Sequence, residues 1–147
     1  MASTTPPICV TGLRGFPDVM GGIESHCEEL LPRIAALAPE QPIVVLGRAP
    51  YLPERRRIWR GVEIVGLRCP QSKHFETILS TLFAIVAAKR RGADVLVIIT
   101  EWDQFRALDL DRIKLLMNQP VLVDLRNIYK PHDMLVRGFA YSSVGRA

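Results

Sequence analysis

The sequence lacks the cysteine pattern of a metal site or of a disulfide-stapled fold. Its three cysteines, Cys9, Cys27 and Cys69, are odd in number, and none belongs to a CxxC pair. We therefore expect neither a zinc site nor a disulfide framework. Unpaired thiols are typical of a reducing compartment, which predicts a cytoplasmic protein.

The sequence also lacks a signal peptide and a long hydrophobic run. The segment MASTTPP at 1–7 has neither a positive cluster nor an apolar core, so it does not form a secretory signal. We expect these seven residues to be disordered. The longest apolar helical run, 78–88, is too short to span a bilayer. The sequence therefore predicts a protein without stable membrane insertion.

Positive charge is only slightly in excess, because 19 basic and 15 acidic residues give a formal net charge of +4. The basic residues gather in two clusters, 55–57 with Arg60, and 89–91. Such clusters can meet phosphate groups, nucleic acid or an anionic membrane surface. A solvated loop and a helix C-terminus explain them better. No aromatic residues alternate with the arginines, so we expect no nucleic-acid binding.

Strand-like and helix-like segments alternate along the 147 residues. Alternation of this kind favours right-handed βαβ crossovers and a parallel sheet. We predict one α/β domain over 8–147, a single Rossmann-like doubly wound, mostly parallel sheet of about six strands with helices on both faces. The predicted strands are 8–13, 42–47, 61–67, 95–99, 121–125 and 139–144, with a Pro- and Arg-rich loop between the second and third. Their expected order in the sheet is 3-2-1-4-5-6.

A glycine loop after the first predicted strand is the first candidate site. Gly21 and Gly22 precede a helix whose apolar positions recur over 23–37. Paired glycines let the backbone approach a ligand, and the free amides of a helix start favour an anion such as phosphate. A tight turn that needs positive φ explains the same pair equally well, so both interpretations stay open.

Polar residues gather after the apolar run 95–99. They are Thr100, Glu101, Trp102 and Asp103. Ligands of open α/β sheets bind outside the carboxyl ends of the strands, so this cluster is a second candidate site. The alternative is that Asp103 or Asp109 caps the next helix while Trp102 packs on the sheet. A further helix is expected at 73–91, capped by Ser72, where His74 either contacts a substrate or lies in a solvated first turn.

Residues 8 to about 96 resemble the amino-terminal domain of family 4 glycosyltransferases of the GT-B fold, particularly the bacterial rhamnosyltransferase-like branch. The segments GLRGFP (12–17), GGIE (21–24), LGR (46–48) and GVEIV (61–65) carry the resemblance. It implies that this part holds an acceptor and that the glycine loop approaches a donor diphosphate. We count Arg14 and Glu24 of these segments among the substrate-facing residues. The E-x7-E motif of that family's donor domain is absent.

From about Gly92 to Arg146 the chain resembles the carboxyl-terminal, UDP-binding domain of bacterial UDP-glucose 6-dehydrogenases. The segments TEWDQF (100–105), PVLVDLRN (120–127) and GFAY (138–141) carry the resemblance. It implies that Arg126, which matches the arginine of the family's DxRN motif, contacts the nucleotide of UDP or a UDP-sugar. The parent family uses NAD, but the GxGxxG fingerprint and the GGSC-type nucleophile motif are absent. We expect no cofactor, no catalytic residue and no metal in this chain.

The two resemblances meet near 92–97, so the sequence predicts a hybrid of a glycosyltransferase-like part, 8–96, and a dehydrogenase-like part, 97–147. Both parent families serve bacterial capsule or exopolysaccharide synthesis. Three functions stay open. The chain is a non-catalytic nucleotide-binding module, an accessory subunit that associates with a full-length parent enzyme or forms an oligomer, or an unproductive fusion.

The missing motifs lead to a first prediction. The chain alone will not reduce NAD in the presence of UDP-glucose, because the sequence has neither the dinucleotide loop nor the thiol nucleophile of the parent family. NADH absorbance measures this directly. A rate above background that persists through further purification and disappears in Arg126→Ala would contradict the prediction.

Overall fold

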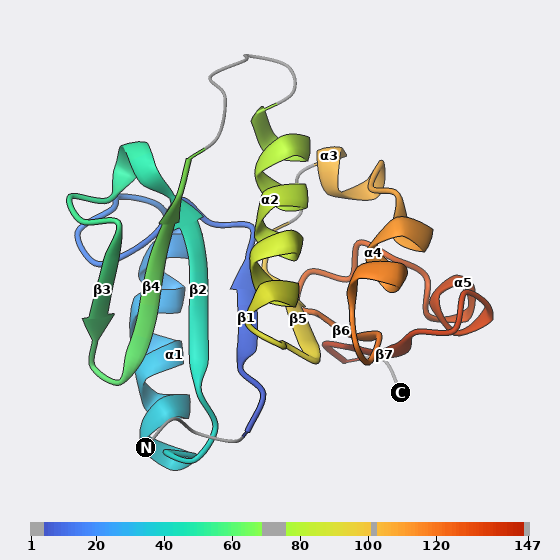
Figure 1. Ribbon diagram of the computed structural model, residues 1–147, viewed down its shortest axis with the longest axis horizontal. Coiled ribbons are helices and arrows are strands. Elements are labelled where there is room, and N and C mark those ends of the chain that lie inside the picture. Colours follow the sequence, from blue (N-terminus) through green and yellow to red (C-terminus); the bar gives the residue numbers. More distant parts are fainter. Residues whose placement is uncertain (1–4, 69–75, 101–102, 146–147) are drawn as a thin grey trace.

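A parallel sheet edged by one antiparallel strand runs through the protein in the computed structural model, which describes residues 5–68, 76–100 and 103–145 (Figure 1). Its seven strands lie in the order β3-β4-β2-β1-β5-β6-β7. Their bounds are β1 Ile8–Thr11, β2 Ile43–Arg48, β3 Arg56–Trp59, β4 Val62–Leu67, β5 Val95–Ile98, β6 Val121–Asp124 and β7 Ala140–Ser143. The six predicted strands occur in the predicted order 3-2-1-4-5-6, and the predicted fold class is confirmed.

The edge strand β3 is the main difference from the sequence-based prediction. The Pro- and Arg-rich stretch was expected to be a loop, and this is wrong, because part of it pairs antiparallel with β4. Arg56 forms an ion pair with Glu63 on β4 at 2.8 Å. The guanidinium carbons of Arg57 and Arg60 lie 5.1 and 5.3 Å from the centre of the Trp59 ring. Charged side chains suit an edge strand, but a run of arginines hides the alternation that usually signals one.

The helices begin close to where the sequence places them. Their bounds are α1 Gly22–Leu37, α2 Glu76–Arg90, α3 Asp103–Arg106, α4 Leu110–Leu116 and α5 Pro131–Val136, with a 3-10 turn at Ala49–Tyr51. Asp109 caps α4, because its carboxylate accepts a hydrogen bond from the Arg112 amide at 3.0 Å. Pro131 opens α5, and Gly138 beyond its end has a φ of 81°. The positions of Ser72, His74 and Trp102 lie outside the described residues.

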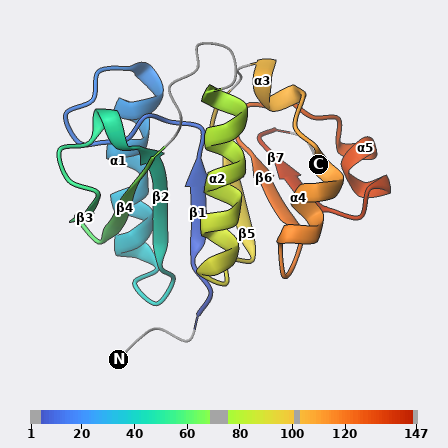
Figure 2. The same cartoon turned by 45° about the horizontal axis from the view of Figure 1, so that its top comes forward.

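The direction of each crossover determines which face its helix covers. The connection from β1 to β2 runs toward the β3 edge, and α1 covers one face. The connections from β4 to β5, β5 to β6 and β6 to β7 run toward the opposite edge, so right-handed crossovers place α2, α4 and α5 on the other face (Figures 1 and 2). Helices therefore cover both faces, as predicted.

Apolar packing follows this division. On the α1 face, Cys27 and Leu31 belong to a buried cluster with Val10, Val45 and Ile64. On the other face, a second cluster joins helices to β5 and β6, and its members include Ile85, Leu96, Ile98, Ile113, Leu122 and Met134.

None of the described helices is long and apolar enough to cross a membrane. At the amino terminus, residues 1–4 of the segment expected to be disordered are not described. The Pro6 carbonyl accepts a hydrogen bond from Nε2 of the Gln41 side chain at 2.8 Å.

Removal of a core side chain from β5 gives a second prediction. Ile98 is fully buried, so Ile98→Ala should lower the free energy of unfolding by about 2–5 kcal/mol. Ile58→Ala on the edge strand is the matched control, because Ile58 is 73% exposed and should cost about 0.5 kcal/mol or less. Urea unfolding followed by circular dichroism compares the two. Equal losses would mean that β5 does not form part of the core.

Candidate functional site

A crevice of about 340 Å³ opens at the carboxyl ends of β5 and β6, beside the start of α1. Its lining residues come from these two sides and are Gly22, Ile23, His26, Ile99, Leu125 and Arg126. The crevice lies where the chain order reverses, since α1 leaves β1 toward one edge of the sheet and β5 begins the other half. Open α/β sheets bind ligands at such a place. The structure thus brings Gly22 and Arg126, two of the predicted site residues, to one cavity.

The two predicted glycines have different surroundings. A Cβ atom built on Gly22 meets no atom within 4 Å, so the backbone of the first residue of α1 is open to the crevice. A Cβ atom on Gly21 would collide with the carboxylate of Glu24 and lie 2.5 Å from Nη2 of Arg14. Gly21 is therefore required by packing, and Gly22 leaves room for a ligand.

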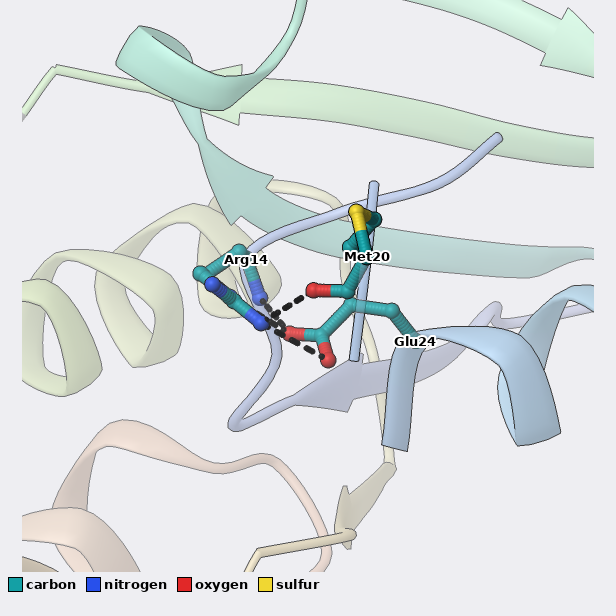
Figure 3. A network of polar contacts seen from close by, with 3 residues as sticks. All are labelled: Arg14, Met20 and Glu24. Carbon is teal, nitrogen blue, oxygen red and sulfur yellow. Dashed lines mark hydrogen bonds and ion pairs between the residues drawn. The ribbon is translucent and has the colours of Figure 1, made fainter. Parts of the chain in front are cut away.

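Arg14 and Glu24 bind each other and hold the glycine loop against α1 (Figure 3). The Arg14 amide and Nε donate to Oε1 of Glu24 at 3.1 and 3.0 Å, and Nη2 donates to Oε2 at 3.3 Å. Nη2 also donates to the Met20 carbonyl at 2.5 Å. We call this pair with the Met20 carbonyl the loop clamp. Neither side chain lines the crevice, so this structure gives both a positioning role beside the site.

The loop clamp is electrostatically favourable although one partner is buried. Glu24 is 4% exposed, and burial alone would raise its pKa. The hydrogen bonds and the charge of Arg14 outweigh burial and hold the pKa of Glu24 below its ordinary value. The hydrogen bond that Arg14 donates to Glu24 in turn raises the pKa of Arg14. Both groups are therefore ionised at neutral pH, which strengthens the hydrogen bonds between them.

Asp124 fixes the loop that carries Arg126. It is fully buried at the end of β6 and accepts hydrogen bonds from the amides of Arg126 and Tyr129 at 3.0 and 3.1 Å, and from the hydroxyl of Tyr141 at 2.7 Å. Asn127 adopts a φ of 56° and donates to the Val144 carbonyl at 3.0 Å. Our reading of the sequence missed Asp124 as a functional residue. The available signal was a lone carboxylate at the end of an apolar strand, which needs several donors to be buried.

The polar cluster after β5 does not reach the crevice in the described residues. Thr100 is fully buried, its methyl group packs on Gly12, and its Oγ1 has no hydrogen-bond partner among the described residues. Asp103 is exposed and pairs with Arg106 one turn later at 3.6 Å. His74 and Trp102 fall outside the part of the chain that the structure describes. Sequence reasoning also left out His26, Ile99 and Leu125, which do line the crevice.

The described cysteines are structural. Burial raises the pKa of Cys9 and of Cys27 to about 12. Neither thiol is ionised at neutral pH, and a thiol attacks only as the thiolate. Cys69 lies outside the described residues. Within the described ranges, no three His, Cys, Asp or Glu side chains are grouped closely enough to hold a metal ion.

Fold and crevice together define a doubly wound α/β domain of the kind that binds nucleotides at the reversal of strand order. Sequence comparison identifies the family that one part of the chain resembles. Residues 69–131 match the sequence model of the UDP-glucose/GDP-mannose dehydrogenase family, UDP binding domain. The predicted resemblance to this domain is confirmed over 92–131, which includes Arg126 and Asp124. The match also covers 69–91, a range expected from the sequence to belong to the glycosyltransferase-like part.

Three curated relatives that match part of the chain are each named UDP-glucose 6-dehydrogenase. The chain is 61% identical over 54 residues to UDP-glucose 6-dehydrogenase of Rhizobium meliloti (strain 1021), which is 37% of this chain and 12% of the relative. It is 51% identical over 55 residues to UDP-glucose 6-dehydrogenase of Pseudomonas aeruginosa, again 37% and 12%. The enzyme of Rickettsia bellii is 43% identical over 54 residues, with the same coverage. The chain thus spans about an eighth of the length of these relatives.

The loop clamp gives a third prediction. Glu24→Gln should lower the free energy of unfolding at pH 7 by about 1–3 kcal/mol, because it removes the charge of a buried carboxylate that accepts hydrogen bonds from Arg14. Since the folded pKa of Glu24 is depressed, its contribution is present above the unfolded pKa of about 4.3 and is lost as the pH falls through the folded value. The difference between wild type and variant should therefore shrink below about pH 4.

Urea unfolding at a series of pH values measures this difference. Glu29→Gln is the matched control on the same helix, because Glu29 pairs with Arg33 in an exposed i,i+4 contact and should matter little at any pH. A Glu24→Gln effect that is small, or that stays constant between pH 7 and pH 3, would contradict the electrostatic role of the clamp.

Proposed function

We propose that the chain is a non-catalytic module that binds UDP or a UDP-sugar in the crevice between α1 and β6. The observation that carries the proposal is that Gly22 and Arg126, which lie 104 positions apart in sequence, line one cavity of about 340 Å³. The similarity of residues 69–131 to a UDP-binding domain supports the choice of nucleotide.

The chemistry of the crevice suits a diphosphate. The first amides of a helix have no partner within it and carry a partial positive charge, so the start of α1 at Gly22 and Ile23 offers donors to phosphate oxygens. Arg126 can add a charge-assisted contact from the opposite side. Asp124 holds the Arg126 amide, and the loop clamp holds the glycine loop. Both sides of the site are therefore fixed before the ligand arrives, which reduces the entropy lost on binding.

The origin of the chain belongs to the same proposal. We take residues 8 to about 68 to derive from a glycosyltransferase amino-terminal domain and the remainder, where the match to the UDP binding domain begins, from a UDP-glucose 6-dehydrogenase, in a cytoplasmic protein of capsule or exopolysaccharide synthesis. The loop clamp supports this, because it joins the GLRGFP and GGIE segments on which the glycosyltransferase resemblance rests. The alternative is an accessory subunit of a full-length parent enzyme, which co-purification with that enzyme would reveal.

UDP titration of two variants gives the fourth prediction. Arg126→Ala should weaken UDP binding about tenfold or more, since a charge-assisted hydrogen bond contributes about 1.5–3 kcal/mol. Gly22→Val should weaken it as well, because the new side chain occupies the crevice while meeting no atom of the protein at its Cβ. Isothermal titration calorimetry measures both affinities.

Lys130→Ala is the matched control for Arg126→Ala. It removes one cation from the same loop, but Lys130 lines a different pocket. Its UDP affinity should equal that of the wild type, and circular dichroism should show all three variants folded. Equal UDP affinity of the wild type, Arg126→Ala and Gly22→Val would exclude the crevice as the nucleotide site.

A further inference from the structure

Polar side chains line the crevice from two opposite sides. His26 comes from α1, and Arg126 comes from the loop after β6. The other four lining residues offer no side-chain hydrogen bond, because they are glycine or aliphatic: Gly22, Ile23, Ile99 and Leu125. Among the described side chains of this cavity, a polar ligand therefore has His26 and Arg126 as its partners.

The helix places His26 on the same side as Gly22. Residues four apart lie one turn apart on one face of a helix, and side chains lean toward the helix N-terminus. The His26 side chain therefore leans toward the first turn of α1, where a Cβ atom built on Gly22 meets no atom within 4 Å. Glu24 and Cys27 occupy the buried side of these turns, whereas His26 is exposed and within reach of a ligand.

The charged groups around His26 leave a cation and no carboxylate on the crevice wall. Arg126 faces it from the loop after β6, and the end of β5 contributes only aliphatic lining. On α1, Glu24 is engaged in the loop clamp, and Glu29, one turn beyond His26, is engaged in an exposed i,i+4 ion pair. At the end of β6, Asp124 is buried under its hydrogen-bond donors. An anion in the crevice therefore meets two nitrogen-bearing side chains without an opposing carboxylate among the described lining residues.

We infer that His26 is a second phosphate-binding side chain of the crevice and that it binds as the imidazolium, so that binding of a UDP-sugar takes up a proton. This inference rests on the proposed function, because it needs a diphosphate in the crevice. Without a ligand, a protonated His26 faces the like charge of Arg126. A diphosphate between the two side chains replaces this repulsion by attraction to both. Imidazoles gain their proton between about pH 5 and 8, so the affinity falls as the pH rises through this range.

UDP-glucose is the probe for this inference. Both of its phosphates are esterified on two sides, so its charge stays constant over the range, whereas the terminal phosphate of UDP itself titrates near pH 6. The wild type should bind UDP-glucose about fivefold more tightly at about pH 5.5 than at about pH 8, because a charge-assisted hydrogen bond is roughly twice as strong as a neutral one. Isothermal titration calorimetry measures the affinities. Titrations at neutral pH in buffers of different ionisation enthalpy measure the proton uptake.

His26→Gln keeps a hydrogen-bond donor but cannot carry the charge. Its affinity for UDP-glucose should match that of the wild type near pH 8 and should not increase on acidification, and its proton uptake should be lost. His132→Gln is the matched control, because His132 is exposed on α5 and does not line the crevice. This variant should keep the pH profile of the wild type. Circular dichroism over the same pH range checks that all three proteins are folded.

Each outcome decides the inference. A flat wild-type profile, or the same pH dependence in the wild type and in His26→Gln, overturns it while UDP-glucose binding leaves the proposed function standing. A His26→Gln variant that is weakened by one constant factor at every pH also overturns it, since the imidazole would then only shape the crevice wall. Loss of the pH dependence in His132→Gln would assign the proton to a different histidine. If the folded wild type binds no UDP-glucose at any pH, this inference and the proposed function both fail.

Discussion

The handedness of the βαβ crossover is the constraint on which the rest of this structure depends. Because a right-handed connection places its helix according to the direction in which the chain moves, the reversal after β1 puts α1 on one face and α2, α4 and α5 on the other. The same reversal separates the start of α1 from the end of β6 and leaves the crevice between them. It also leaves the side chains of Val95 and Val123, on β5 and β6, partly exposed beside α1. One topological choice therefore creates both the crevice and this partly exposed apolar strip.

Much of this arrangement could be predicted from the sequence, because helix-like segments separate all the predicted strands except the second and third. These strands are mostly apolar and lie at 8–13, 42–47, 61–67, 95–99, 121–125 and 139–144. The strand order was predicted from the order typical of doubly wound sheets, and it placed Gly22 and Arg126 together. The edge strand β3 was not predicted, because the side-chain contacts that support it do not form a pattern in the sequence. These contacts are the ion pair of Arg56 with Glu63 and the two arginines beside the Trp59 ring. The positioning roles of Arg14 and Glu24 were not predicted for a related reason. Charged residues near a glycine loop suit a ligand and suit each other equally well, and only their mutual distance distinguishes the two.

Two carboxylates position the candidate site from opposite sides. Glu24 is buried against Arg14 and fixes the glycine loop, and Asp124 is buried under three donors and fixes the loop of Arg126. A buried carboxylate is costly without partners, so each one commits its loop to a single conformation. The crevice between them is lined by groups whose backbone is held in place. Such preorganisation favours binding of a rigid, multiply charged group over a flexible neutral one.

Strand β5 contributes side chains to the buried clusters on both faces of the sheet. Val97 and Ile99 belong to the buried cluster on the α1 face, whose other buried members lie in 10–64. Leu96 and Ile98 belong to the cluster on the opposite face, whose other buried members lie in 85–139. Because side chains alternate along a strand, one continuous apolar run serves both clusters at once. The strand therefore connects the two halves of the sheet in two ways, by its buried side chains and by the parallel backbone pairing of β1 with β5. The proposed fusion is foldable because one strand completes the core on both faces.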